Sequence, residues 1–456
     1  MTLRTRLLKA HPAMLVLGSF LLAMILGMLL LKLPAASRNG RLDWIDAMFT
    51  ATSAVCVTGL VVVDTGGHFT RFGQGVILGL IQIGGLGVMT LSVILFRWIG
   101  KTVSFRQRMV MQDLFAPSPR EDIFSLVKST LLFTFGAELA GTALLTVHWC
   151  REFPLPRALY VAVFHSVSAF CNAGFALFPD SMTRYSDNVL LNLTLCGLIV
   201  LGGIGFPVLY DLQSRFAEKR PHRRRLSVQT KTVLLTTFIL IALGAGLFIL
   251  LEPRPHVEAA SLSHRLLVSL FQSVTCRTAG FNTVDIGGLS NATLALMIFL
   301  MFYGASPGSC GGGVKTTTLA LLAAFTTARI RKHKRVNLFK KSIPDETVTR
   351  SMSLVLVSIG IICTILFMLL AGEPTTVHAP AVQERPFLAY LFETVSAFGT
   401  VGLSMGATPD LNSWDKGWII LMMIIGRVGV LTFAYIVVGS GATSGVAHAE
   451  ENLMIG

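Results

Sequence analysis

A short phrase that occurs four times is the feature that most constrains this chain. It reads SAVCVTG from Ser53, SAFCNAG from Ser168 and SAFGTVG from Ser396, and a looser copy with one more residue, SVTCRTAG, begins at Ser273. Each copy ends in glycine and lies between two long apolar segments, and the final glycines are 115, 106 and 122 residues apart. Four copies of one unit indicate four-fold pseudosymmetry about an axis.

The composition is that of a membrane protein. Apolar residues make up 53% of the 456 residues and charged residues only 14%, whereas soluble domains are about 25% charged. Of the 38 Lys and Arg residues, 23 lie in four segments beside expected spans, namely 1–12, 97–122, 211–231 and 327–350. This is the pattern of cytoplasmic loops. The net charge of +14 therefore reflects membrane topology, and we expect no nucleic-acid partner.

The repeats predict an all-α membrane protein with four pseudo-symmetric helix–pore loop–helix units around a central pore. Each unit would contain a span, a half-length helix, the phrase and a returning span, which makes eight transmembrane helices. The expected units are 1–122, 123–231, 232–350 with an intramembrane loop at 304–318, and 351–456. An even number of spans puts both termini on the cytoplasmic side of the cell membrane. We expect the first span, Ala13–Leu33, to be retained rather than cleaved as a signal.

The four phrases predict an ion filter. Non-helical backbone in a membrane is tolerated only where it is buried in protein or lines a water-filled cavity. Four such loops around one axis would surround it with backbone carbonyls, which can replace the hydration shell of a cation. The alternative, that these small residues only permit close helix packing, is less favoured with four matched copies. The expected filter residues are Cys56, Val57, Thr58, Gly59, Cys171, Asn172, Ala173, Gly174, Arg277, Thr278, Ala279, Gly280, Gly399, Thr400, Val401 and Gly402.

A glycine-rich break in the returning span of unit three predicts a gate below this filter. Units one and two have GGxG at the corresponding place, and unit four has GRVG, which puts Arg427 in mid-membrane at a cost of about 2.5–3.5 kcal/mol. Carbonyls of a broken helix are suitable partners for this cation. The alternative is that Arg427 only ties two helices together. The expected gate residues are Gly304, Ala305, Ser306, Pro307, Gly308, Ser309, Cys310, Gly311, Gly312, Gly313, Lys315 and Arg427.

Other polar residues give weaker signals. Asp64 and Asp285 follow two of the filter glycines by five residues, so they either concentrate cations at an outer mouth or are ordinary turn residues. Glu138 lies within a span and is either functional or hydrogen-bonded to a neighbouring helix. The seven cysteines form no C-x-x-C pair and predict neither disulfides nor a zinc site. Because no acid, base and nucleophile group assembles, we expect neither an enzyme nor an organic cofactor.

The four phrases and the segment SPGSCGGGVKTT from Ser306 together resemble the Trk/Ktr/HKT superfamily of cation transporters over essentially the whole chain. The chain begins directly with unit one, as in the KtrB type. This resemblance implies channel-like K+ uptake, with K+ at the filter carbonyls, and four filter glycines are similar to K+-conducting members. It also implies a homodimer in membrane lipid and a cytosolic ring of nucleotide-binding regulatory subunits of the KtrA type. Activation by Na+ is implied only by analogy.

Two further expectations follow. The regulatory ring should dock on the basic loops, including Arg223, Arg224 and Arg225. The main alternative function is a secondary transporter with ion-coupled alternating access, a class in which inverted repeats and broken helices are found. Units that each cross twice enter from the same side, which argues against inversion. A membrane enzyme is a distant third possibility.

Overall fold

The computed structural model describes residues 12–38, 40, 42–98, 123–217, 226–252, 261–372, 380–430 and 433. These residues are helical, apart from short connections and one small hairpin of β1 (Asn337–Leu338) and β2 (Lys341–Ser342). Most of the basic segments 1–12 and 97–122 lie outside the described residues, as do Arg223–Arg225 and most of the tail after 430.

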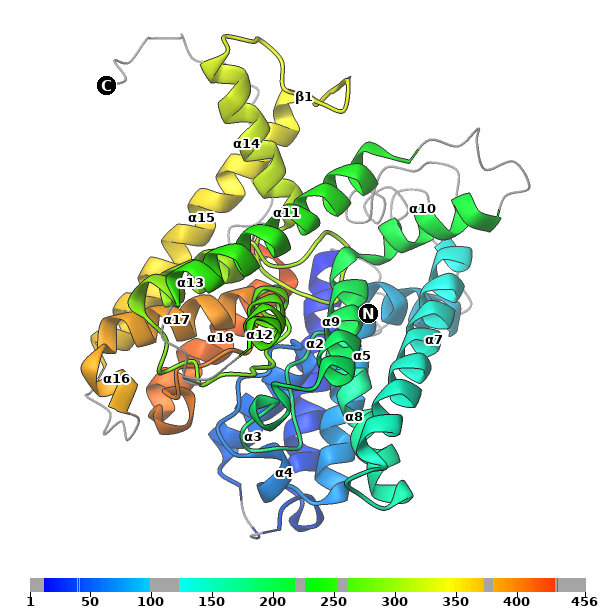
Figure 1. The fold of residues 1–456 in the computed structure, drawn as a ribbon, viewed down its shortest axis with the longest axis vertical. Coiled ribbons are helices and arrows are strands. Elements are labelled where there is room, and N and C mark those ends of the chain that lie inside the picture. Colours follow the sequence, from blue (N-terminus) through cyan, green and yellow to red (C-terminus); the bar gives the residue numbers. More distant parts are fainter. Residues whose placement is uncertain are drawn as a thin grey trace, which may run out of the picture.

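Each unit contains the expected succession of helices (Figure 1). The first helices are α2 (Pro12–Leu31), α7 (Ile123–Trp149), α11 (Val228–Leu251) and α15 (Asp345–Leu370). The half-length helices, here called pore helices, are α3 (Trp44–Val55), α8 (Leu155–Phe170), α12 (Leu262–Thr275) and α17 (Pro386–Gly399). The return helices are α5 (Arg71–Trp98), α9 (Val189–Ile204) with α10 (Phe206–Ala217), α13 (Asn291–Phe302) with α14 (Thr316–Ile330), and α18 (Ser413–Val428). Short helices α4 (Thr65–His68), η1 (Pro34–Ala36), η2 (Thr183–Tyr185), α16 (Pro380–Glu384) and η4 (Thr408–Asp410) lie in the connections.

Two first helices begin earlier than hydropathy predicts. The apolar part of the third unit suggests a start at Thr232, but α11 begins at Val228, where the side chain of Ser227 accepts a hydrogen bond from the Thr230 amide. The fourth first helix begins at Asp345 rather than Met352, with acidic residues in its first turn. Hydropathy locates only the part of a helix that lies in lipid, whereas caps and first-turn charges locate its end.

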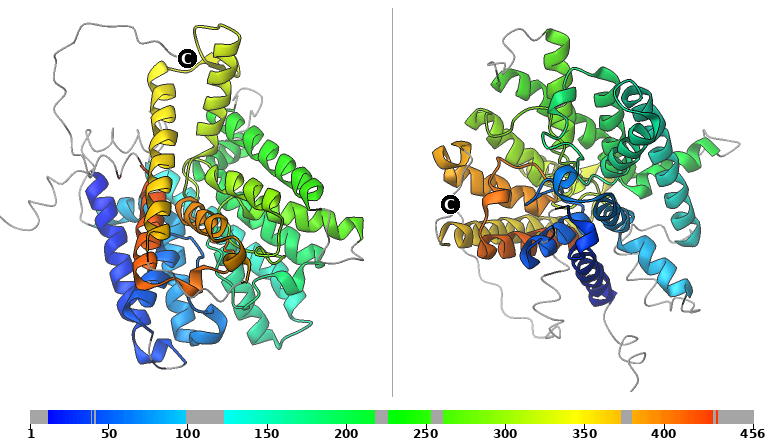
Figure 2. Two further views of the ribbon diagram at one scale, coloured as in Figure 1. Left: turned by 90° about the vertical axis from the view of Figure 1, so that its left-hand side faces the viewer. Right: turned by 90° about the horizontal axis from the view of Figure 1, so that it is seen from below.

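The four units close into a ring. The return helix of each unit packs on the pore helix of the next, so that α5 contacts α8, α9 contacts α12, α13 contacts α17, and α18 contacts α3. Seen from below, the colours of the chain run round the molecule in sequence order (Figure 2, right). The contact of α18 with α3 joins the last unit to the first, and it places the pore helices at the centre.

The outer surface of the ring is apolar. Large side chains such as Leu132, Phe238 and Leu356 are about two-thirds exposed on the first helices, at 69%, 70% and 69%. The polar side chains of the four phrases, by contrast, are buried. Among the described residues, three helices are long and apolar enough to cross a bilayer, namely Val127–Trp149, Val228–Leu251 and Asp345–Leu370, and the bent pair of Val189–Ile204 and Phe206–Arg215 would make a fourth if it forms one span. An apolar exterior around a polar centre is the arrangement of a protein with lipid as its solvent.

The return helices are broken in every unit, which the sequence had indicated only for unit three. Helices α9 and α10 meet at 96°, with Gly205 between them at φ +99°. Gly87 in α5 and Gly429 after α18 also have positive φ, +76° and +95°. In unit three the break is the longer segment between α13 and α14. Beyond it, α14, the β hairpin and the start of α15 project from the rest of the molecule (Figures 1 and 2).

Candidate functional site

The four phrases share one backbone conformation at the ends of the pore helices. Two residues before each final glycine the chain is left-handed, with φ of +58°, +58°, +65° and +50° at Val57, Asn172, Thr278 and Thr400. The final glycines Gly59, Gly174, Gly280 and Gly402 have φ of +92°, +69°, +79° and +92°. Left-handed φ is uncommon outside glycine, so its fourfold recurrence indicates a backbone held by its surroundings. Counted back from the glycine, the third copy matches the others, and its extra residue lies on the helix side.

The final glycines form a closed ring. A Cβ placed on Gly59 would lie only 2.5 Å from the carbonyl oxygen of Ala173 in the next unit. The same relation joins Gly174 to the carbonyl of Ala279, Gly280 to that of Val401, and Gly402 back to that of Thr58. Each glycine therefore packs against the backbone of the following unit, and the residue before each glycine brings its carbonyl oxygen to this ring.

The hydroxyl side chains of the phrases hold the loops in place. Ser53 and Ser396 accept hydrogen bonds from the amides of their own final glycines, both at 3.1 Å. Ser168 instead donates to the carbonyl of Phe175 at 2.8 Å, and in the third copy Thr275 donates to that of Phe281 at 2.6 Å. The repeated serine is thus explained by loop geometry, and the one-residue shift in the third copy is accommodated by Thr275.

The broken segment of unit three lies against the filter loops. Gly312 donates its amide to Thr400 Oγ1 at 2.9 Å, and a Cβ on Gly311 would overlap the side chain of Thr278. The segment also bonds the return helices of its two neighbours. The backbone amide of Cys310 donates to the carbonyl of Gly202 at 3.2 Å, and the amide of Gly313 donates to the carbonyl of Gly426 at 3.3 Å.

Two cations donate to carbonyls of this segment, Arg427 from α18 and Lys315 from the end of the segment itself. The guanidinium of Arg427 donates to the carbonyl of Cys310 in the segment and to that of Gly84 in α5. The ammonium of Lys315 donates to the carbonyls of Gly311 and Gly312 at 2.8 and 3.1 Å. Unit three is thereby linked through Arg427 to unit one, which faces it across the ring.

The GGxG motifs have two separate roles, which the sequence alone did not assign. The first glycine lets the return helix touch the end of its own pore helix, because a Cβ on Gly84, Gly202 or Gly426 would overlap the carbonyl of Val55, Phe170 or Phe398, respectively. The last glycine forms the break described above. The signal was the repetition of the motif at one place in three units.

The carboxylates singled out by the sequence have structural partners. Asp64 accepts hydrogen bonds from the amides of Gly66 and Gly67 at the start of α4, and Asp285 accepts one from Gly287 at 3.1 Å. Both therefore stabilise turns, and a further role at the outer mouth stays a prediction. Glu138 accepts a hydrogen bond from Gln82 of α5 at 3.0 Å, which is the neighbouring-helix contact that the sequence left open.

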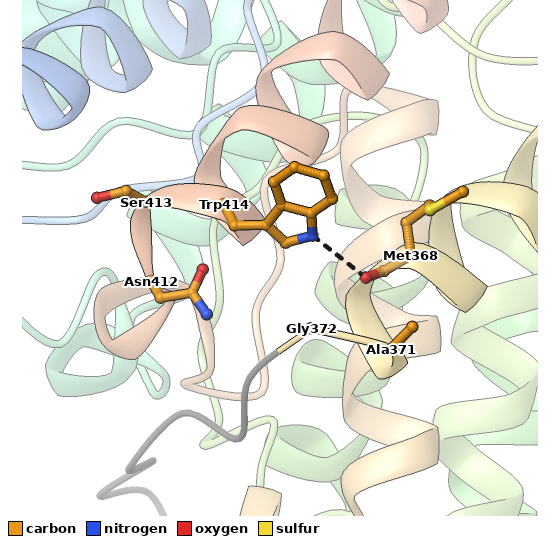
Figure 3. Close-up of a pocket in the computed structure, with 6 residues that line it drawn as sticks. All are labelled: Met368, Ala371, Gly372, Asn412, Ser413 and Trp414. Atoms are coloured by element: carbon orange, nitrogen blue, oxygen red, sulfur yellow. Dashed lines mark hydrogen bonds between the residues drawn. The ribbon is translucent and has the colours of Figure 1, made fainter.

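No group of three His, Cys, Asp or Glu residues able to hold a metal ion occurs in the part of the chain that the structure describes. One hollow, of about 450 Å³, lies away from the ring between the end of α15 and the start of α18 (Figure 3). Trp414, which is 56% exposed, donates to the carbonyl of Met368 there at 3.5 Å. A half-exposed Trp near helix ends is typical of a membrane–water boundary.

Comparison with known proteins identifies the family. The sequence profile of TrkH, described as a cation transport protein, matches residues 13–442. The chain belongs to the TrkH family of cation transport proteins. Its fold agrees, because the crystal structure of the potassium transporter TrkH from Vibrio parahaemolyticus matches 94% of this chain and covers 85% of that one, with a TM-score of 0.73 and 18% identity.

Curated members of the TrkH family are similar over almost the full length. The Ktr system potassium uptake protein B of Vibrio alginolyticus is 39% identical over 98% of this chain and 96% of its own length. The protein of the same name from Bacillus subtilis is 38% identical over 93% and 92%. The potassium/sodium uptake protein NtpJ of Enterococcus hirae is 36% identical over 98% of both chains. The resemblance inferred from the phrases is thus confirmed.

Proposed function

We propose that this chain is the membrane-embedded, K+-translocating subunit of a Ktr-type uptake system. The single observation that carries the proposal is the closed ring of glycines, in which the carbonyls of Thr58, Ala173, Ala279 and Val401 each lie against the final glycine of a neighbouring unit. Carbonyls in such a ring replace the water around a dehydrated cation, and the C-terminal ends of four pore helices add partial negative charge. The relatives named potassium uptake proteins support K+ as the ion.

The segment between α13 and α14 acts as the gate in this proposal. Its hydrogen bonds to units two and four, and its link through Arg427 to unit one, support a position across the path beneath the filter. A guanidinium held there also repels K+. Moving the segment would break the bonds of Arg427 and the backbone bonds to Thr400, Gly202 and Gly426. The closed state is therefore defined by specific contacts, of which those of the guanidinium are charge-assisted.

The system around the subunit is also proposed. Ktr naming of the relatives supports a partner subunit. We propose that this partner is a cytosolic nucleotide-binding ring and that the chain forms a homodimer in lipid. The basic hairpin between α14 and α15, which includes Lys334, Arg335 and Lys341, is continuous with the gate segment and suits an acidic docking surface. The name of the Enterococcus relative, which includes sodium, supports Na+ as an activator or second ion.

The test of the function is flux through the purified protein. Proteoliposomes loaded with K+ should take up radioactive Rb+ when a membrane potential is the only driving force. Vesicles without protein give the background uptake. Excess external Na+ should compete with Rb+ far less than excess external K+ does. Absence of Rb+ uptake under a potential, at normal protein incorporation, would refute the channel-like function.

One observation favours the alternative of a coupled secondary transporter. The return helices of units one, two and three are interrupted, and α18 of unit four ends at Gly429 with positive φ. Broken helices are typical of such transporters. The same vesicles discriminate between the two. Uptake that requires an inward Na+ or H+ gradient, and that does not respond to a potential alone, would favour the transporter.

A further inference from the structure

Buried polar side chains on three pore helices contact the chain just beyond the filter. Here we call residues 175–179, 281–285 and 403–408 the post-filter segments. Each contact reaches the third residue after the final glycine, and each polar side chain is at most 1% exposed. The side chains are His165, Gln272 and Glu393, and their partners are Leu177, Thr283 and Met405, respectively.

Glu393 makes the largest set of contacts. Its Oε1 accepts hydrogen bonds from the Ser404 hydroxyl at 2.5 Å and from the Met405 amide at 3.0 Å. Its Oε2 accepts one from the Thr408 hydroxyl at 2.7 Å. A buried carboxylate is costly unless its oxygens are supplied with donors, and here every contact is a donor. One side chain of α17 thus fixes both ends of its post-filter segment.

His165 makes the corresponding contact in unit two as a neutral ring. Its Nδ1 lies 2.8 Å from the carbonyl oxygen of Val161, and because a carbonyl can only accept, Nδ1 carries the hydrogen. Nε2 therefore has a free lone pair, which accepts from the Leu177 amide at 3.3 Å. The ring also stacks on Phe178, with centroids 5.2 Å apart, so its orientation is held from two directions.

Unit one is held differently. Glu393 and His165 each lie nine residues before the final glycine of their phrase. In unit one this position is Thr50. Within the described part of the chain its hydroxyl finds no hydrogen-bond partner. Instead, Gln74 of the return helix α5 donates to carbonyls in the connection after the filter, including that of Phe69 at 3.0 Å.

We propose that His165, Gln272 and Glu393 are positioning residues for ion selectivity, with Glu393 the most important. This inference rests on the proposed filter. Met405 is three residues from Gly402, whose backbone packs against the carbonyl of Thr58 in unit one. Release of the post-filter segment would therefore move a filter carbonyl in its own unit and loosen the contact that closes the ring. Because carbonyl geometry sets the preference among cations, the expected effect is on selectivity.

The experiment compares Glu393→Ala, Glu393→Gln and a matched control, Thr394→Ala, by the ratio of K+ to Na+ uptake in proteoliposomes at equal protein content. Thr394 is equally buried on the same helix, but its hydroxyl donates to the Tyr390 carbonyl of that helix and, among the described residues, makes no contact with the post-filter segment. Glu393→Ala should lower the ratio by about tenfold, equivalent to about 1.4 kcal/mol. Glu393→Gln should keep most of it, because its oxygen still accepts from Met405 and the Thr408 hydroxyl can turn to accept from the amide nitrogen.

A gentler variant, Ser404→Ala, removes one donor from the half-buried end of the contact set, so it tests the proposal should Glu393→Ala not fold. It should lower the ratio of K+ to Na+ uptake by about twofold to threefold, which is less than the effect of Glu393→Ala, because only one of the hydrogen bonds of Glu393 is lost. Parental selectivity in Glu393→Ala or in Ser404→Ala, or Glu393→Gln as unselective as Glu393→Ala, would overturn the positioning role. Gly402→Ser tests the filter independently of the positioning role. It should lose selectivity even if the positioning role is wrong, whereas unchanged selectivity in Gly402→Ser would count against the filter itself.

Discussion

At the scale of single residues, the geometry of the filter depends on the absence of a side chain at the four final glycines. Gly402 has φ +92° and faces the backbone of Thr58 and Gly59 in another unit. Serine at this position meets two penalties, since left-handed backbone costs an ordinary residue about 1–2 kcal/mol and the new Cβ overlaps backbone atoms that have no rotamer to change. The neighbouring units must shift, and the shift falls on the carbonyls of the ring.

Gly402→Ser should therefore reduce the preference for K+ over Na+ by about tenfold. The abundance of the protein should fall by a smaller factor. Gly417→Ser is the matched control, because a Cβ on Gly417 would meet nothing within 4 Å. Competition between Rb+ and Na+ uptake in cells that lack other K+ uptake systems measures the preference. The filter would be contradicted if Gly402→Ser and the three equivalent variants, Gly59→Ser, Gly174→Ser and Gly280→Ser, all kept the ion preference of the parent.

At the scale of elements, the return helices of units one and two are divided by a glycine of positive φ, and α18 ends at another. The divided helix can touch its own pore helix with its first half and turn away with its second, as α9 and α10 do at Gly205. In unit three the same break is enlarged into a segment with its own hydrogen bonds. The element proposed as the gate is thus an elaboration of the break at Gly87 and Gly205 in units one and two.

Deletion within 308–313 should raise Rb+ flux in the absence of any regulatory subunit, because the segment would no longer reach beneath the filter. Arg427→Ala should raise it less, since the amide bonds of the segment to Thr400, Gly202 and Gly426 persist. Arg427→Lys should fall between parent and Arg427→Ala, because an ammonium lacks the fork that bridges two carbonyls. The measurement is initial flux per folded protein in proteoliposomes. A deletion that folds normally and conducts no better than the parent would show that the segment is not a gate.

At the scale of the whole molecule, the ring and its apolar exterior set the relation to the membrane. The contact of α18 with α3 closes the ring, and the exposed apolar side chains lie around it. The basic hairpin between α14 and α15 projects at one end (Figure 1). Positive charge favours the cytoplasmic side, so this end should face the cytoplasm and the post-filter segments should face outward.

Single cysteines on a cysteine-free background test this orientation. Arg184→Cys lies at an exposed position after the second filter loop, and Lys341→Cys lies at an exposed position in β2. An impermeant thiol reagent should label Arg184→Cys in intact cells and Lys341→Cys only after the membrane is opened. Both cysteines should react equally in detergent, which controls for accessibility. Labelling of Lys341→Cys in intact cells would reverse the topology.

How much of this protein follows from its sequence depends on the range of the interaction. The first helices and pore helices were predictable because apolar length and the recurring phrase are local signals, and α2, at Pro12–Leu31, agrees with the expected span Ala13–Leu33 to within two residues. The presence of a break near Gly304 was equally local, since glycine and proline cannot continue a helix there. The need of Arg427 for carbonyl partners followed from the cost of burying a charge.

The tertiary structure alone decided which groups meet. That Arg427 bridges Cys310 and Gly84, and that Glu393 reaches Ser404, Met405 and Thr408, depends on contacts between segments brought together only by closure of the ring. The breaks at Gly87, Gly205 and Gly429 were likewise hidden, because a glycine is compatible with either a continuous or a divided helix. The sequence by itself determined four repeated units with backbone free to turn at their ends. Packing of each unit against the next determined that these ends form one ring.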